Sequence, residues 1–336
     1  MRFGYDEICL QHDPGPRHPE IPDRIRAVRR TLEATHGARF VTSDPADGET
    51  IAAVHDPAYV ATIEETCLAG GGPLDHDTVV SAESWMAART SVGLAIDAVA
   101  TAGPTVERTA IPFALGRPPG HHAMPDSAMG FCIFNNVAIA AEVAIDADGV
   151  ECVAIIDWDV HHGNGTEAIF LDRSDVLFAS IHEDGLYPGT GAAEESGSGT
   201  GRGKTLNVPL KPGATTAAYD LTFTTVIEPW LAAHQPDLLI VSAGFDAHKY
   251  DPISRMSVTT EGFGLMTSRL LSLIDDLDAG IAFVLEGGYG LETLSDGVRM
   301  VHEVCHGYTP DPSGEEPRPA DEAVLDEVRT VHGLGS

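Results

Sequence analysis

The sequence has little positive charge, and lysine is especially scarce. Its 336 residues include 20 basic residues, only three of them lysines, against 51 aspartates and glutamates, and the net charge is −31. This deficit of cationic side chains argues against direct binding of nucleic acid. An acidic surface attracts cationic substrates such as lysine-rich tails or polyamines. Because the acidic residues are spread along the whole chain, we favour adaptation to a salt-rich cell interior instead.

Long apolar runs and paired cysteines are also missing. No run approaches the roughly 18 apolar residues that a membrane-spanning helix needs. The N-terminal MRFGYDEICLQHD lacks the apolar core of a signal peptide. The five cysteines show no CxxC spacing and stand mostly among apolar residues, which is typical of reduced, buried thiols. We therefore expect a cytoplasmic protein with no membrane partner.

The densest group of chemically functional side chains follows residues 153–156, a Val-Ala-Ile-Ile run typical of a buried strand. In an extended segment Asp157, Asp159 and His161 point to the same side. Two carboxylates at such close range repel each other unless a cation lies between them. The pattern therefore predicts a metal site at the end of this strand. The alternative is an acidic strand end exposed to water.

A second cluster is the histidine pair His121 and His122. It lies in a loop rich in glycine and proline, residues 116–123, which follows the strand-like residues 111–115. Histidine titrates near neutral pH, so two imidazoles on a stiff loop can serve as general base and general acid. A pair of packed surface histidines is the alternative interpretation.

Apolar strand-like segments alternate with helical segments along the chain. The expected strands are residues 2–9, 111–115, 153–156, 176–182, 207–210, 238–246 and 281–285. The longer expected helices are residues 22–35, 50–68, 82–102, 215–234, 260–277 and 291–305. This alternation predicts a parallel sheet with helices on both faces, whose site lies beyond the carboxyl ends of the strands. We expect one catalytic domain over residues 1–307, then a Pro-rich tether and a short helix over residues 308–336.

Six ordered motifs resemble the histone deacetylase superfamily, which includes deacetylase-like amidohydrolases and acetylpolyamine amidohydrolases. They are RPPGHHA, GFCIFNN, DWDVHHGNGT, SIH with YPGTG, VSAGFDAHKYDP and LEGGYG. The resemblance runs from about Tyr5 to about Gly307, and the HHGNGT and LEGGY forms are similar to the class II branch. It implies an arginase-like three-layer α/β fold with a mainly parallel eight-stranded sheet.

The resemblance also implies two metal ions. A catalytic zinc ion would be held by Asp159, His161 and Asp246. A structural potassium ion would be bound by the side chains of Asp157 and Ser180 and by the backbone carbonyls of Asp159, His161 and Ile181. Zinc, iron and cobalt all suit the first site, because affinity and availability together decide which metal is used in the cell.

The catalytic residues that the resemblance implies are His121 and His122, with Asp157 behind the first and Asn164 beside the second, and Tyr289. A metal with three protein ligands keeps an open position for an activated water. One histidine would accept the proton of that water, and the Tyr289 hydroxyl would bind the substrate carbonyl. Asn164 is not an anionic partner, so we expect His122 to be less easily protonated than His121.

The same resemblance implies an acyl-lysine channel. Phe131 and Tyr187 would form its aromatic walls and Gly130 its floor, while Gly288 would let the catalytic tyrosine approach the metal. Tyr187 replaces the phenylalanine that is common in the family. Ile253 stands where polyamine-selective relatives carry a glutamate, which argues against specialisation for acetylpolyamines.

We therefore expect a zinc-dependent amidohydrolase that removes acetyl or another short acyl group from lysine side chains of proteins or peptides. The same chemistry on acetylpolyamines or other small acylated amines is the main alternative. A ureohydrolase of the arginase type would need more bridging carboxylates than the VSAGFDAHKYDP motif supplies with Asp246 and, at most, Asp251. A non-catalytic acyl-lysine reader would have no use for the complete set of ligands and catalytic groups. The oligomeric state stays open.

Overall fold

One parallel sheet forms the centre of the protein. The structure is a computed structural model that describes residues 1–146, 149–311 and 314–335. Eight strands lie in the order β2-β1-β5-β10-β9-β6-β7-β8, and every neighbouring pair in this sheet is parallel. The strands are β1 (Arg2–Gly4), β2 (Arg39–Val41), β5 (Pro112–Ala114), β6 (Val153–Asp157), β7 (Val176–Glu183), β8 (Thr205–Leu210), β9 (Leu238–Ala243) and β10 (Gly280–Leu285).

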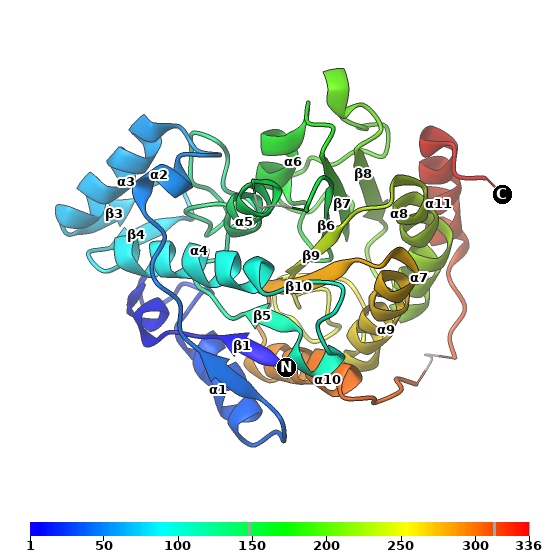
Figure 1. Ribbon diagram of the computed structural model, residues 1–336, viewed down its shortest axis with the longest axis horizontal. Coiled ribbons are helices and arrows are strands. Elements are labelled where there is room, and N and C mark those ends of the chain that lie inside the picture. Colours follow the sequence, from blue (N-terminus) through cyan, green and yellow to red (C-terminus); the bar gives the residue numbers. More distant parts are fainter. Residues whose placement is uncertain (147–148, 312–313, 336) are drawn as a thin grey trace.

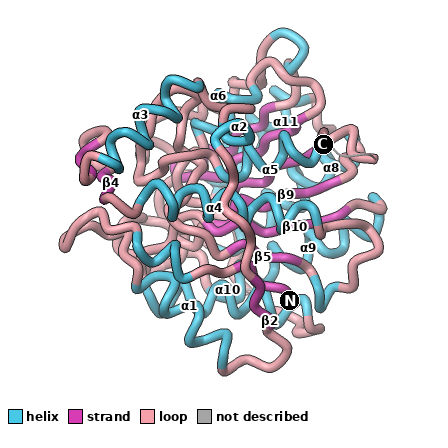
Figure 2. The backbone as a smooth tube through the Cα atoms, turned by 60° about the vertical axis from the view of Figure 1, so that its left-hand side comes forward, coloured by secondary structure: helices cyan, strands magenta, loops and turns pink. Residues whose placement is uncertain are grey.

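Helices cover both faces of this sheet (Figures 1 and 2). On one side lie α4 (Ser84–Ala100), α5 (Asn136–Ile145) and α6 (Asn164–Phe170), and α3 (Pro57–Leu68) and α2 (Gly48–Ile51) lie beyond them. On the other side lie α1 (Asp23–Glu33), α7 (Thr216–Thr222), α8 (Glu228–His234), α9 (Thr260–Leu277), α10 (Leu291–Cys305) and α11 (Pro319–His332). The expected three-layer α/β fold is confirmed.

The strand β6 shows how the sequence builds the two cores. Its side chains alternate between the faces of the sheet, as the two-residue period of a strand requires. Val153 and Ile155 pack with α4 and α5, whereas Ala154 and Ile156 pack with the helices of the opposite side. A strand buried on both faces has to be apolar along its length, which is why the run before Asp157 is Val-Ala-Ile-Ile.

Several expected elements have other boundaries. The strand expected over residues 2–9 ends at Gly4, because the Asp6 side chain accepts a hydrogen bond from the Ile8 amide (2.9 Å) and starts a 3-10 helix, Glu7–Gln11. The helix expected over residues 50–68 is two helices, and Asp56 caps the second. The edge strand β2 and the antiparallel pair β3 (Gly71–Pro73) and β4 (Val79–Ser81) were not expected.

The C-terminal helix α11 packs against the same body. Val324, Leu325 and Val328 lie in the core that also contains Leu206 and Val208 of β8. The division after residue 307 therefore does not separate two cores, and its functional meaning stays a prediction. Among the described residues, no helix combines the length and apolarity needed to span a membrane.

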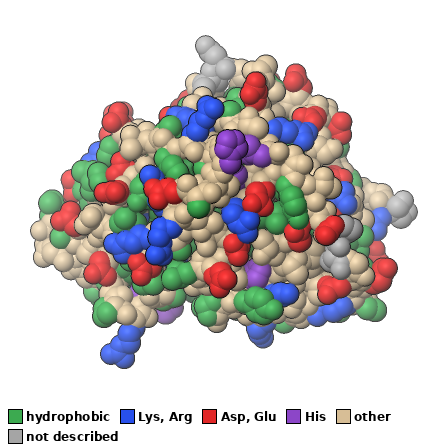
Figure 3. All heavy atoms as spheres, turned by 90° about the horizontal axis from the view of Figure 1, so that it is seen from below, with side chains coloured by type: hydrophobic (Ala, Val, Ile, Leu, Met, Phe, Trp, Pro, Cys, Tyr) green, Lys and Arg blue, Asp and Glu red, His purple; other side chains and the backbone are tan. Residues whose placement is uncertain are grey.

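Charged side chains of both signs are mixed on one face of the molecule (Figure 3). On the face drawn in Figure 3, acidic and basic side chains are intermingled and do not form a patch of one sign. This arrangement agrees with the even spread of acidic residues along the sequence.

Candidate active site

Three ligand-type side chains meet beyond the carboxyl ends of β6 and β9. Asp159 and His161 follow β6 and Asp246 follows β9, and one ligand atom from each lies within 4.8 Å of the other two. His161 Nδ1 is 3.0 Å from Asp159 Oδ1 and 3.2 Å from Asp246 Oδ2. All three residues are buried. The expected zinc ligands thus face one point.

This donor set fits a divalent cation. Asp246 Oδ2 is buried, and apart from the 3.2 Å contact with His161 Nδ1 it has no hydrogen-bond partner among the described residues. A Cβ atom at Gly287 would collide with the carboxylates of both Asp246 and Asp159. Burial and the charge of Asp159 raise the pKa of Asp246 to about 7. Two carboxylates and one imidazole are ligands that zinc accepts and leave a position open for a further ligand. A bound cation would also relieve the repulsion between the carboxylates.

His121 is held from behind by Asp157. Its Nδ1 is 2.9 Å from Asp157 Oδ2, and its Nε2 is 3.8 Å from Asp159 Oδ1. The carboxylate at Nδ1 fixes the proton on that nitrogen and turns Nε2 toward the metal ligands. Burial opposes a charge on this ring, but Asp159 and Asp157 outweigh it and raise the pKa of His121 to about 10.

His122 has a different environment. Its Nδ1 is 2.7 Å from Asn164 Oδ1, and its ring centroid lies 4.0 Å from that of His121. Burial, followed by the neighbouring His121 and His161, lowers its pKa well below the ordinary histidine value. Asn164 supplies an amide oxygen but no charge, so the pKa values of the two histidines differ in the direction expected from the sequence.

Tyr289 lies in the loop that follows β10. The guanidinium carbon of Arg24 is 4.8 Å from its ring centroid, and its amide donates to Asp251 Oδ2 (2.7 Å). The preceding Gly288 has φ of +120°, which favours glycine, and its carbonyl accepts from Arg24 Nε (2.6 Å). Burial raises the pKa of Tyr289 well above the ordinary value, and Asp246 adds to this effect. Tyr289 therefore stays a neutral phenol that can donate a hydrogen bond.

The expected channel residues surround the same groups. The Phe131 and Tyr289 rings are 5.7 Å apart, edge to face, and the Tyr187 ring is 5.1 Å from that of His122, also edge to face. A Cβ atom at Gly130 would collide with the His122 ring, and Gly130 has φ of +57°. Only glycine fits at this position between the walls.

Ile253 is half-buried, and hydrogen bonds through Asp251 join its loop to the loop that carries Tyr289. Its amide donates to Asp251 Oδ1 (3.1 Å). The other oxygen of Asp251 accepts from the amides of Tyr289 and Gly290. Both carboxylate oxygens of Asp251 therefore bind backbone amides, which leaves this residue in a structural role.

The side chains expected to bind potassium come from neighbouring strands. The register of β6 and β7 pairs Asp157 with Ser180, and both are buried. Ser180 Oγ is 3.0 Å from His182 Nδ1. Ile181 follows directly in β7. The strand pairing thus brings these residues together, although their ligand roles stay a prediction.

The sequence did not point to several buried charged residues that support the site. Glu20 accepts hydrogen bonds from Arg24 (3.0 Å) and from Arg117 (2.8 and 2.6 Å), and Glu286 bonds the backbone beside His121. Arg117 and Glu286 lie within the quoted motifs, but their type alone does not distinguish support from catalysis. Asp77 accepts a hydrogen bond from the Gly130 amide (3.2 Å).

Comparisons with known proteins agree with this geometry. A family model described as the histone deacetylase domain matches residues 18–305. A histone deacetylase-like amidohydrolase of Pseudomonas aeruginosa is 39% identical over 309 residues, which cover 85% of this chain and 81% of that protein. A probable deacetylase of Archaeoglobus fulgidus is 37% identical over 295 residues, which cover 86% of this chain and 81% of that protein. The crystal structure of the HDA15 HD domain matches with a TM-score of 0.89 at 36% identity and covers 98% of this chain and 94% of that one.

Proposed function

The chain belongs to the histone deacetylase family, a family of hydrolases, and we propose that it is a zinc-dependent amidohydrolase acting on acylated lysine side chains. It would release acetate or another short carboxylate. The observation that carries this proposal is the convergence of the three ligand atoms of Asp159, His161 and Asp246 within 4.8 Å. The histidine pair and the Tyr289 loop lie around the same point.

Asp159, His161 and Asp246 would hold the zinc ion. When bound, zinc polarises a carbonyl and lowers the pKa of a coordinated water from about 15.7 to about 7. Asp157 and Ser180, with neighbouring carbonyls, would bind a structural potassium ion behind His121. The pairing of Asp157 with Ser180 in adjacent strands supports this second assignment.

His122 is the residue best suited to accept a proton. Its lowered pKa keeps the ring neutral near pH 7, and the Asn164 oxygen fixes the hydrogen on Nδ1. Nε2 is then free to take a proton from the nucleophilic water and to return it to the leaving amine. His121, with its raised pKa, carries a positive charge near the developing oxyanion.

Tyr289 completes the arrangement. As a neutral phenol it donates a hydrogen bond to the substrate carbonyl and to the oxyanion that this carbonyl becomes. Phe131 and Tyr187 would hold the aliphatic part of the acylated lysine between their rings. These two walls exclude water from the side chain and present its amide to the histidines.

Small acylated amines such as acetylpolyamines are the second candidate substrates. Asp77 favours them, because its partly exposed carboxylate lies beside Gly130 and could pair with a distal ammonium group. Ile253 favours lysine side chains, because it offers no charge to such a group. The five free cysteines support a reducing, cytoplasmic location, and we take residues 1–307 as the catalytic domain.

The deciding experiment measures kcat/KM of the metal-analysed protein on acetyl-lysine peptides and on acetylspermidine. A higher value on the peptides supports the lysine proposal, and a higher value on acetylspermidine supports the alternative. Absence of amide hydrolysis by protein that retains one tightly bound divalent ion would refute both.

A further inference from the structure

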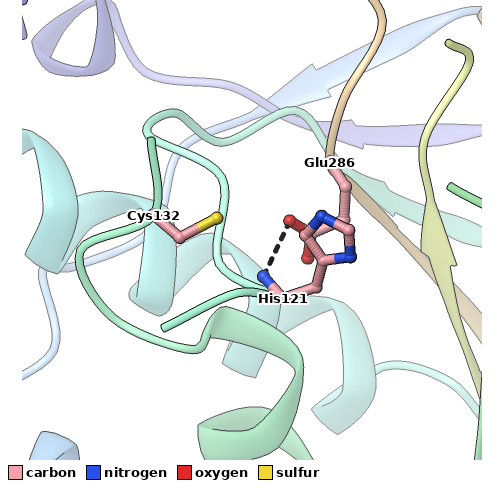
Figure 4. A group of neighbouring side chains, drawn as sticks. All are labelled: His121, Cys132 and Glu286. Atoms are coloured by element: carbon pink, nitrogen blue, oxygen red, sulfur yellow. Dashed lines mark hydrogen bonds between the residues drawn. The ribbon is translucent and has the colours of Figure 1, made fainter. Parts of the chain in front are cut away.

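Glu286 is a buried carboxylate at the end of β10. Its side chain has no exposed surface. Oε2 accepts hydrogen bonds from the amides of Gly120 (2.7 Å) and His121 (3.1 Å), and Oε1 lies 3.3 Å from Ser242 Oγ. Figure 4 shows this side chain reaching to the backbone nitrogen of His121. A ring nitrogen of His121 and the sulfur of Cys132 lie within 4.8 Å of one of its carboxylate oxygens, but among the residues that the structure describes no basic side chain lies within ion-pair distance of it.

Such a carboxylate is costly to bury. An ionised carboxylate away from water needs a counter-charge or several hydrogen bonds. Here the hydrogen-bond partners are two backbone amides and one hydroxyl, and burial raises the pKa of Glu286 to about 7 although the nearby charge of His121 opposes the rise. An apolar residue at this place would fill the same volume without that cost. We therefore attribute the presence of a carboxylate at this position to the backbone segments that its hydrogen bonds hold in place.

Glu286 connects the two loops that carry the chemistry. One is the loop of the histidine pair, which it binds through the amides of Gly120 and His121. The other is its own loop, which places Tyr289 three residues further on. The next residue, Gly287, donates its amide to Asp159 Oδ2 (2.8 Å). A single side chain thus fixes the distance between the histidine loop and the tyrosine loop.

We propose that Glu286 is a positioning residue, which holds the loop of His121 and His122 against the loop of Tyr289 so that both face one substrate amide. The Gly120 position supports this assignment, because a Cβ atom there would collide with the backbone of Asn136. The histidine loop is thus packed tightly against the start of α5, and its amides are bound by the Glu286 carboxylate. This inference rests on the proposed amidohydrolase function.

The test compares Glu286→Ala with Glu286→Gln. Alanine removes both backbone hydrogen bonds, and a displacement of about 1 Å in a reacting group costs about 10²-fold in rate. We expect Glu286→Ala to lose about 100-fold in kcat, with KM changed by less than about 3-fold and the metal retained. Glutamine keeps an oxygen for the two amides and offers its nitrogen to Ser242, so we expect it to stay within about 5-fold of the wild type.

Asp321→Ala is the matched control. Asp321 is another fully buried carboxylate, but it lies in α11 and its side chain binds Arg318. Its loss should lower the unfolding temperature and leave kcat unchanged. Thermal unfolding of all three variants separates stability from turnover.

Two outcomes would overturn the inference while leaving the proposed function intact. One is a wild-type kcat in folded Glu286→Ala. The other is an equal loss of kcat in the glutamine and alanine variants, because the retained oxygen would then have no effect. The wild-type protein tests the proposed function separately, and a wild type that hydrolyses no acyl amide refutes both ideas together.

Discussion

Replacing Tyr289 by phenylalanine tests the proposed chemistry most directly. The ring would still pack against Phe131, 5.7 Å away, and under the Arg24 guanidinium, 4.8 Å away. The loop would keep its backbone hydrogen bond to Asp251 (2.7 Å). The change therefore removes one hydroxyl and leaves its surroundings in place.

The expected loss follows from the role of that hydroxyl. The raised pKa of Tyr289 keeps it protonated near neutral pH, since burial and the nearby carboxylates oppose the phenolate. Removal of one oxyanion donor costs about 2.7–4 kcal/mol, which is about 10²- to 10³-fold in kcat. Because the hydrogen bond strengthens as charge develops on the carbonyl oxygen, the loss should appear in kcat more than in KM.

The assay is steady-state hydrolysis of an acetyl-lysine peptide, with metal content and thermal unfolding measured on the same samples. Tyr308→Phe is the control, because that tyrosine is 42% exposed and lies after α10. The control should turn over like the wild type. A Tyr289→Phe variant with near-normal kcat would refute the assignment of this hydroxyl to the carbonyl oxygen.

Three further predictions concern the histidines, the metal and the channel. Asn164→Asp places a carboxylate beside His122 and raises its pKa; because the neutral ring is the base, the acidic limb of kcat/KM should move to higher pH, and an unmoved limb would exclude His122 as the base. Chelation should abolish turnover until zinc is restored. Chelation should also destabilise the protein more at about pH 8 than at about pH 6. In the metal-free protein the folded-state pKa of Asp246 is raised to about 7, so the stability that its protonated form contributes is lost as pH rises through that value. An equal loss of unfolding temperature on chelation at the two pH values would contradict this account. Gly130→Ala should fold but lose most activity, because its Cβ atom displaces the His122 ring; full activity would show that the channel floor is elsewhere.

The strand ends made much of the site predictable. Asp157, Asp246 and Tyr289 each follow an apolar run that is recognisable without coordinates, and parallel strands bring their carboxyl ends to one edge. The resemblance to a known family then assigned a role to each residue. The sequence alone did not reveal the edge strand β2, whose three residues are too few for a recognisable pattern, and it placed the end of β1 five residues too late.

Supporting residues were harder to predict for a physical reason. Glu286 and Gly120 are 166 residues apart, and a carboxylate that binds backbone amides leaves no pattern at its partner, since every residue other than proline has an amide. Arg24 is similar in part, because besides the Glu20 side chain its partners are the backbone carbonyls of Glu286 and Gly288. Contacts to side chains constrain both residue types in a pair, whereas contacts to the backbone constrain only one.

The balance of buried charge connects the metal site with this support. Asp157, Asp159, Asp246 and Glu286 are all fully buried near the same sheet edge. The side chains that pair directly with the three aspartates are His121 and His161, whose pKa values rise to about 10 against the effect of burial. Two imidazolium groups do not neutralise four carboxylates. Burial raises the pKa values of Asp246 and Glu286 to about 7, and the neighbouring charges of Asp159 and Asp157, respectively, add to this effect. A divalent cation at Asp159, His161 and Asp246 would take the place of the proton on His161 and so add one net positive charge, which reduces the excess of negative charge among these buried carboxylates. The same positive centre is what a zinc-dependent hydrolase needs to polarise an amide, so the charge that stabilises this edge of the sheet would also serve the chemistry.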